Sequence, residues 1–203
     1  MYSRQTKHLR ADRASLALML VWAIAVSLPL TFLMASHSLP LPITIPAQIV
    51  TNTVSADTRW QAEHILVADC PCSEFVADYL IERGARPELH ETVWLLGGSA
   101  TWEEKIKSSG FAVQHLDAET VAAHYGIQGG PWLRLISPTG VLAYSGGYAP
   151  KRARSTTDIC DLNLWHSVAQ GATVTPYPAF GCASSSWLRK TLDPLGMKYG
   201  AAK

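Results

Sequence analysis

Two cysteines separated by one proline, Cys70-Pro71-Cys72, are the residues whose types and spacing most clearly carry chemistry. They follow a mostly apolar run over residues 62–68 and begin a stretch with helical spacing of apolar residues, 73–83. A helix N-terminus has partial positive charge and free N–H groups, which favour thiolate over thiol. Because a thiolate is both a nucleophile and a metal ligand, the motif predicts either redox or metal chemistry.

In the redox interpretation, one thiol attacks a substrate disulfide and the other resolves the mixed disulfide. The sequence predicts Cys70 as the nucleophile and Cys72 as the resolving thiol. A single intervening residue makes the disulfide ring tight, and strain raises the reduction potential. Asp69 acts in the opposite direction, since a nearby carboxylate disfavours a thiolate. The motif therefore predicts an oxidant or isomerase more than a reductase.

In the metal interpretation, the thiolates of Cys70 and Cys72 bind Cu(I), which soft thiolate ligands select in low coordination. Cys182 or a histidine would supply a further ligand. The histidines show no ligand spacing with one another: His64, His90, His115, His124 and His166. A copper-binding chaperone is thus an alternative to the oxidoreductase. A non-catalytic accessory subunit of a membrane complex is a third possibility.

Two further cysteines, Cys160 and Cys182, lie late in the chain. One prediction is a structural disulfide between them that pins the C-terminal segment. The alternative places Cys182 beside the Cys-Pro-Cys motif as a third redox thiol, because Gly181 permits a close backbone approach. The sequence does not fix the connectivity of four cysteines.

The length and charge of the chain limit the classes of function that it can have. Its 203 residues allow one domain with additional segments, and the 48% hydrophobic content suffices for a packed core. The net charge of +1 argues against nucleic-acid binding, which usually requires a strongly basic face.

The N-terminal region predicts export. Residues 15–35 contain no charged residue and match the thickness of a bilayer, and four basic residues precede them: Arg4, Lys7, Arg10 and Arg13. We therefore expect a cytoplasmic tail over 1–13 and a transmembrane anchor over 14–35. The protein would be a single-pass inner-membrane protein with a periplasmic globular domain. A cleaved signal peptide is the alternative, although its apolar region is usually about 7–15 residues long.

The rest of the chain reads as a linker followed by alternating strands and helices. Three prolines favour an extended linker over residues 36–57. Strands are predicted over 62–68, 91–96 and 111–115, helices over 73–83, 101–108 and 118–125, and a hairpin over 132–136 and 141–144. Ser99 is a candidate cap for the second helix. This order predicts an α/β domain with a mixed sheet, followed by two helices over 157–169 and 184–192.

Several of these features occur together in the thioredoxin superfamily, which the chain resembles over about residues 59–148. A strand leads into the two-cysteine motif, and Tyr125-Gly126 later precedes Gly129-Gly130-Pro131 and the hairpin. The resemblance implies that Pro131 is a cis-proline facing the thiols. It also implies a thioredoxin-like mixed sheet flanked by helices over 58–150, with a C-terminal extension over 151–203 packed on it.

The chain departs from the usual pattern of that superfamily. One residue separates the thiols instead of two, Asp69 replaces the usual tryptophan, and Gly130 replaces threonine or valine before the proline. The chain is similar to membrane-anchored bacterial thioredoxin-like proteins of the RedB type, which have Cys-Pro-Cys and a late Gly-Cys. That similarity implies a thiol–disulfide oxidoreductase that needs no cofactor. Its partners would be exported thiol-containing proteins or a membrane redox protein.

Overall fold

The structure is a computed structural model that describes residues 15–31, 40–42, 58–194, 196 and 198–200. It divides into two compact units, residues 1–39 and residues 40–203. In the first unit, the described residues form one helix over 15–31. The second unit contains the Cys-Pro-Cys motif, the two later cysteines and all the strands described below.

Within the anchor predicted for residues 14–35, the described residues 15–31 form a helix. Within the described part of the chain, no helix has the length and apolar character needed to cross a membrane. The predicted transmembrane helix is therefore not supported. Residue 14, residues 32–35 and the predicted tail 1–13 lie outside the described residues.

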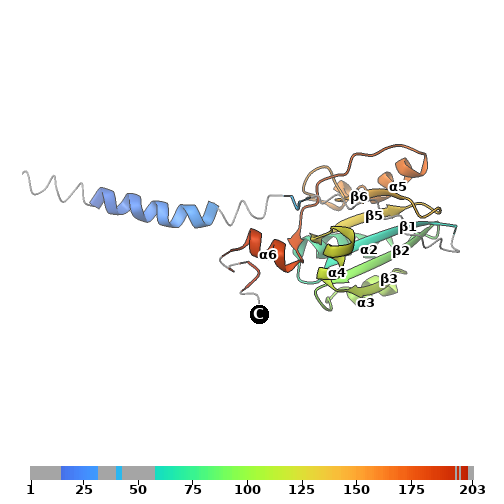
Figure 1. Ribbon diagram of the computed structural model, residues 1–203, viewed down its shortest axis with the longest axis horizontal. Helices are drawn as coiled ribbons and strands as arrows, with labels where there is room; N and C mark the ends of the chain where they lie inside the picture. The colour runs from blue at the N-terminus through green and yellow to red at the C-terminus, as the bar shows by residue number, and fades with distance from the viewer. Residues whose placement is uncertain (1–14, 32–39, 43–57, 195, 197, 201–203) are drawn as a thin grey trace, which may run out of the picture. The chain divides into compact units, whose positions relative to one another are not determined.

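A five-stranded mixed sheet forms the centre of the second unit (Figure 1), in the order β3-β2-β1-β5-β6. Its strands are β1 (Trp60–Val67), β2 (Leu89–Leu96), β3 (Ala112–Leu116), β5 (Trp132–Ile136) and β6 (Leu142–Gly146). The first three strands run parallel, and β5 is antiparallel to both β1 and β6. This arrangement confirms the predicted α/β class with a mixed sheet.

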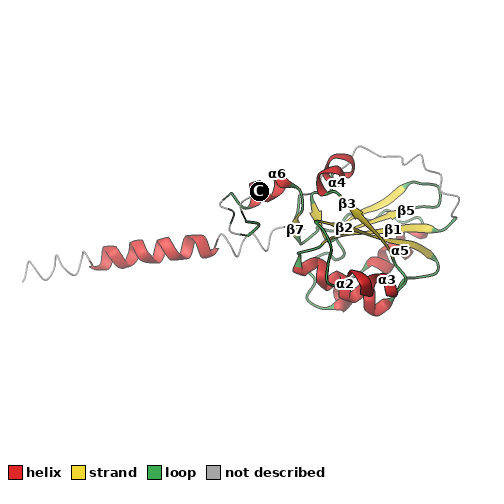
Figure 2. Cartoon of the chain, turned by 90° about the horizontal axis from the view of Figure 1, so that it is seen from below, coloured by secondary structure: helices red, strands yellow, loops and turns green. Residues whose placement is uncertain are grey.

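Helices cover both faces of the sheet (Figure 2). On one face, α2 (Pro71–Arg83), α3 (Glu103–Ser108) and α5 (Asp161–Ala169) pack into one core cluster, through side chains such as Leu80, Ile106 and Leu164. A second cluster includes Val121 of α4 (Ala118–Tyr125) and Leu188 of α6 (Ser186–Leu192). The central strand β1 contributes to both clusters. Its last three residues, Ile65, Leu66 and Val67, are apolar and buried because both faces of the sheet are covered there.

Side chains cap the N-termini of α4 and α6, whereas α2, α3 and α5 have no side-chain cap. Asp117 caps α4 by accepting a hydrogen bond from the backbone N–H of Thr120, and Gly126 ends that helix in the left-handed conformation. The expected cap at Ser99 is wrong, because α3 begins after Trp102 and has no side-chain cap. The helix predicted over 157–169 is divided into a 3-10 turn, Thr156–Asp158, and α5. A capping box between Ser155 and Asp158 closes that turn.

The segment after residue 150 packs against the sheet domain and belongs to the same compact unit. Its strand β7 (Cys182–Ala183) pairs antiparallel with β4 (Gly129–Gly130), a pairing that the sequence did not predict. Within the predicted linker 36–57, the structure describes residues 40–42. Leu41 is buried and donates its backbone N–H to the carbonyl of Ala179 at 2.7 Å, so this part of the linker is attached to the domain.

Candidate redox site

The two thiols of the Cys-Pro-Cys motif lie where β1 passes into α2. Cys70 is the N-cap residue of α2, and Pro71 occupies the first helical turn, where the missing N–H has no intrahelical partner in any case. Cys70 is 2% exposed, whereas Cys72 is half-buried. Cys70, which the sequence predicts as the nucleophile, is therefore the less accessible of the two thiols. It belongs to the second core cluster, together with Val67 and Trp132.

Pro131 joins the short strand β4 to β5, beside the motif. The Gly130–Pro131 peptide bond is cis, as the resemblance implied. The carbonyl of Gly130 lies 3.7 Å from the Sγ atom of Cys70 and accepts a hydrogen bond from it when this thiol is protonated. A Cβ atom on Gly130 would lie 2.7 Å from the carbonyl oxygen of Ile65, so only glycine fits between β1 and the proline. The proline and the buried thiol are thus held together by the backbone.

A dithiol at the start of a helix, on the central strand of this sheet and beside a cis-proline, decides the fold. The chain has a thioredoxin-like fold. The resemblance to the thioredoxin superfamily is thereby confirmed at the level of the fold.

Several solved structures are similar to this chain. A hypothetical protein from Sinorhizobium meliloti superposes with a TM-score of 0.53 at 18% identity, covering 72% of this chain and 97% of that one. An uncharacterized conserved protein from Geobacillus kaustophilus gives a TM-score of 0.45 at 13% identity, covering 73% and 91%. The thioredoxin domain of a thiol-disulfide oxidoreductase from Bacteroides vulgatus gives 0.40 at 16% identity, covering 67% and 97%. No family model matches the chain, and no curated protein matches it.

In this thioredoxin-like domain, the C-terminal extension adds a third thiol to the site. Gly130 of β4 is paired with Cys182 of β7. Gly181 makes this possible, since a Cβ atom there would lie 1.8 Å from the carbonyl oxygen of Gly130. The Cys182 thiol consequently interacts with the Cys70 thiol. Of the two placements considered for Cys182, the structure has the one beside the Cys-Pro-Cys motif.

The three thiols ionise as a coupled set. Hydrogen bonds from the Cys182 and Cys72 thiols hold the pKa of Cys70 far below its ordinary value, although burial opposes this. The backbone N–H and the hydroxyl of Ser73, at the start of α2, act in the same direction. The hydrogen bond to Cys70 raises the pKa values of both Cys72 and Cys182. The site therefore favours one thiolate, on Cys70, with two protonated thiols donating to it.

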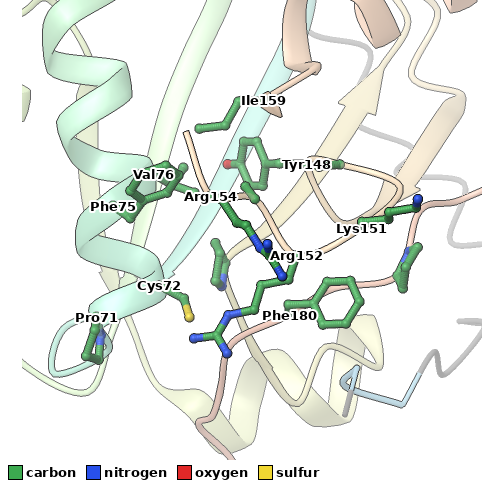
Figure 3. A pocket seen from close by; sticks show the side chains of 14 residues that line it. Pro71, Cys72, Phe75, Val76, Tyr148, Lys151, Arg152, Arg154, Ile159 and Phe180 are labelled. Carbon is green, nitrogen blue, oxygen red and sulfur yellow. The ribbon is translucent and has the colours of Figure 1, made fainter. Parts of the chain in front are cut away.

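A groove of about 240 Å³ opens beside Cys72 and Pro131. Figure 3 shows the Cys72 thiol facing the loop that carries Arg152, whose side chain also hydrogen-bonds that thiol. Apolar side chains, including Val76, Ile159 and Phe180, line the groove. A substrate in this groove meets Cys72 first, because Cys70 is not among the lining residues.

A buried polar network lies behind the groove. The hydroxyl of Tyr148, which lines the groove, is 2.8 Å from Nδ1 of His64, and Nε2 of His64 is 3.2 Å from the carboxylate of Glu91. Arg83 bonds both Glu91 and Asp161 and so joins α2, β2 and α5. Each charge in the network has an opposite charge beside it, which a buried charge requires. His64 is thus a structural histidine in this fold.

The remaining predicted ligands are not gathered at the site. Cys160 packs against the core cluster on the α2 face and donates a hydrogen bond from its thiol to the carbonyl of Asp158. All four cysteines are free, so the disulfide predicted between Cys160 and Cys182 is not present. Among the described residues, no group of three His, Cys, Asp or Glu side chains is arranged to bind a metal ion. The copper alternative, in which Cys70 and Cys72 bind Cu(I), therefore stays a prediction.

Sequence reasoning missed two features of the site: the burial of Cys70 and the position of the basic cluster 151–154 at the groove. The signal for the first is proline directly after Cys70, which starts the helix there and directs the next residue, Cys72, outwards. The signal for the second is the cluster of basic residues in 151–154, which follows the last strand of the sheet.

Proposed function

We propose that the protein is a thiol–disulfide oxidoreductase that oxidises thiols in protein substrates, with Cys72 as the thiol that substrates meet. One observation carries this proposal. Cys72 lies on a groove beside the cis-proline, whereas Cys70 is buried and stabilised as a thiolate. Similarity to solved structures supports the fold, and the chemistry is argued from these thiols.

The proposed step starts from a Cys70–Cys72 disulfide. A substrate thiolate attacks the sulfur of Cys72, a mixed disulfide forms, and the S–S bond breaks with its electron pair passing to Cys70. A second thiolate of the substrate then attacks the mixed disulfide and releases Cys72, which takes up a proton. The substrate loses two electrons and gains a disulfide, and the Cys70–Cys72 pair is reduced.

The direction of this exchange follows from the stability of Cys70 as a leaving group. A thiol with a low pKa leaves faster, and a stabilised reduced form makes a disulfide more oxidising. The opposite direction would require Cys72 to attack a substrate disulfide, but its raised pKa leaves it protonated. An oxidant therefore suits the site better than a reductase or an isomerase, because the latter two begin with attack of an enzyme thiolate on a substrate disulfide.

Pro131 and Cys182 have supporting roles in this proposal. Pro131 shapes the groove and, through the Gly130 carbonyl, positions the buried thiol. Cys182 is the third thiol and acts as a positioning residue that donates a hydrogen bond to the Cys70 thiolate. Neither role requires a metal or an organic cofactor.

A trapping experiment tests the assignment of the two thiols. Full-length Cys70→Ser and Cys72→Ser variants are each incubated with a reduced peptide substrate and glutathione disulfide, and adducts are identified by mass spectrometry. We expect a mixed disulfide to accumulate on Cys72 in the Cys70→Ser variant and little adduct in the Cys72→Ser variant. The reverse pattern would overturn the assignment. If the wild type transfers no disulfide at all, the chain is better explained as an accessory subunit.

We also propose that the domain acts outside the cytoplasm on exported proteins, as the order of charged and apolar residues at the N-terminus favours. Oxidation of substrate thiols suits an oxidising compartment. The test is labelling of Cys72 in intact cells by a thiol reagent that does not cross membranes. Labelling only after the cells are broken would contradict an extracytoplasmic location.

A further inference from the structure

The groove beside Cys72 has a basic wall. The loop that follows β6 places three cations on it, Lys151, Arg152 and Arg154, and all three are exposed to solvent. Figure 3 shows these side chains on the same loop, across from the first turns of α2. None of the residues that line the groove is an aspartate or a glutamate. The groove therefore has a positive potential at its mouth.

The nearby carboxylates do not cancel this potential from inside the groove. Asp158 accepts hydrogen bonds from the backbone N–H groups of Arg154 and Ser155, so its carboxylate is engaged in holding the loop. Glu74 and Asp78 of α2 are exposed and are not among the lining residues. Charges on the walls of a cleft focus the field within it and raise the local concentration of oppositely charged ligands.

The course of a substrate past Cys72 is restricted by the extension. A bound peptide cannot extend the sheet at β4, because β7 already pairs with that strand. The opening that remains is the groove between α2 and the basic loop, which is lined with apolar side chains such as Phe75, Ile159 and Phe180. A ligand of this groove needs apolar surface for the lining and negative charge for the wall.

We propose that this groove selects acidic protein segments, in which a cysteine stands next to an apolar residue and is flanked by aspartate or glutamate. The inference rests on the proposed function and names its substrate class. The apolar side chain contacts the lining of the groove, the carboxylates lie against Lys151 and Arg154, and the substrate sulfur faces Cys72. The charge complementarity raises the association rate more than the intrinsic rate of exchange.

The test measures disulfide transfer from the oxidised full-length protein to three matched peptides. Each peptide contains two cysteines and one leucine, and the flanking residues are glutamate, glutamine or lysine. At low ionic strength we expect the second-order rate constant to be about tenfold or more higher for the glutamate peptide than for the lysine peptide. At about 1 M salt, where the screening length is about 3 Å, the ratio should approach one.

A charge-neutralised variant locates the effect. Lys151→Gln combined with Arg154→Gln removes two cations from the wall and leaves Arg152, which interacts with the Cys72 thiol. The ratio between the glutamate and lysine peptides should fall several-fold in this variant. The control is Lys105→Gln combined with Lys190→Gln. These exposed residues on α3 and α6 do not line the groove, and this variant has the same net charge and should keep the ratio.

The outcomes separate this inference from the proposed function. If the wild type does not exchange disulfides even with the uncharged reagent dithiothreitol, the proposed function fails. If it reacts with dithiothreitol but transfers its disulfide to all three peptides with the same rate constant, or faster to the lysine peptide, only the inference about acidic substrates is overturned. If the ratio falls equally in both double variants, the preference comes from the net charge of the protein and not from the groove, and the inference is likewise overturned.

Discussion

At the scale of single residues, Cys182 has a specific role: it stabilises the Cys70 thiolate. Its thiol donates to the Cys70 thiolate, and a hydrogen bond to a charged group contributes about 1.5–3 kcal/mol. We predict that Cys182→Ala raises the pKa of Cys70 by about one to two units, because each unit corresponds to about 1.4 kcal/mol. The measurement is a pH titration of the ultraviolet absorbance of the thiolate in the reduced, full-length protein.

The matched variant Cys182→Ser separates a hydrogen-bond donor from a third redox thiol. Serine keeps a donor at this position but cannot form a disulfide. If Cys182 acts as a donor, the serine variant stays close to the wild type in both the pKa of Cys70 and the rate of disulfide transfer. Loss of disulfide transfer in the serine variant, with the pKa of Cys70 unchanged, would show that Cys182 exchanges disulfides itself.

At the scale of elements, β7 brings the extension to the active thiols. We predict that Gly181→Ala displaces β7 from β4, since the added methyl group would overlap the carbonyl of Gly130. Cys182 then loses its contact with Cys70, and the pKa of Cys70 rises as in Cys182→Ala. Thiolate titration checks this. The control Gly171→Ala introduces strain at a positive φ but has no atom within 4 Å, so it should leave the pKa of Cys70 unchanged.

The sheet and most helices were predictable from the sequence because their signals are local. Buried runs over β1 and β2, the turn after Ile136 and glycines such as Gly84 and Gly126 all act within a few residues. The β4–β7 pairing was not predictable, since it joins Gly130 to Cys182 across the chain and involves two-residue strands without periodicity. For the same reason, the sequence left open whether Cys182 pairs with Cys160 or lies beside Cys70.

The buried network that joins β1, β2, α2 and α5 makes stability depend on pH. Burial opposes ionisation of Glu91, but hydrogen bonds with His64 and Arg83 outweigh it and lower the pKa to about 2. An acid with a depressed pKa in the folded state stabilises the fold above its unfolded pKa of about 4.5 and loses that contribution as pH falls towards 2. We predict a loss of about 3 kcal/mol in the free energy of unfolding across this range.

Urea denaturation of the full-length chain between about pH 5 and pH 2 measures this loss. Glu91→Gln should lower the free energy of unfolding at neutral pH, because it removes the carboxylate beside Arg83. It should also reduce the fall of that free energy between about pH 5 and pH 2. Glu104→Gln, an exposed residue of α3, is the control and should retain the wild-type dependence. If stability falls with pH as steeply in Glu91→Gln as in the wild type, another carboxylate is responsible for the acid dependence.

At the scale of the whole molecule, the ionisation of one buried thiol couples the fold to its redox state. The reduced protein contains the Cys70 thiolate, whereas the oxidised protein has no ionisable group there. In the unfolded chain the same thiol ionises only near its ordinary pKa of about 8.5. Folding of the reduced form therefore releases a proton below that pH. Its stability rises with pH by up to about 1.4 kcal/mol per unit until about pH 8.5, and the stabilisation is lost as pH falls through the depressed pKa of Cys70.

We predict that the reduced full-length protein gains stability relative to the oxidised protein as pH rises from about 5 to about 8. Urea denaturation of both forms at several pH values measures the difference. Groups such as Glu91 titrate in both forms and cancel in this comparison. Cys70→Ser, compared with the reduced wild type, should lose the additional slope. A difference that is constant over this range would mean that Cys70 stays protonated in the folded protein, and the leaving-group argument for an oxidant would fail with it.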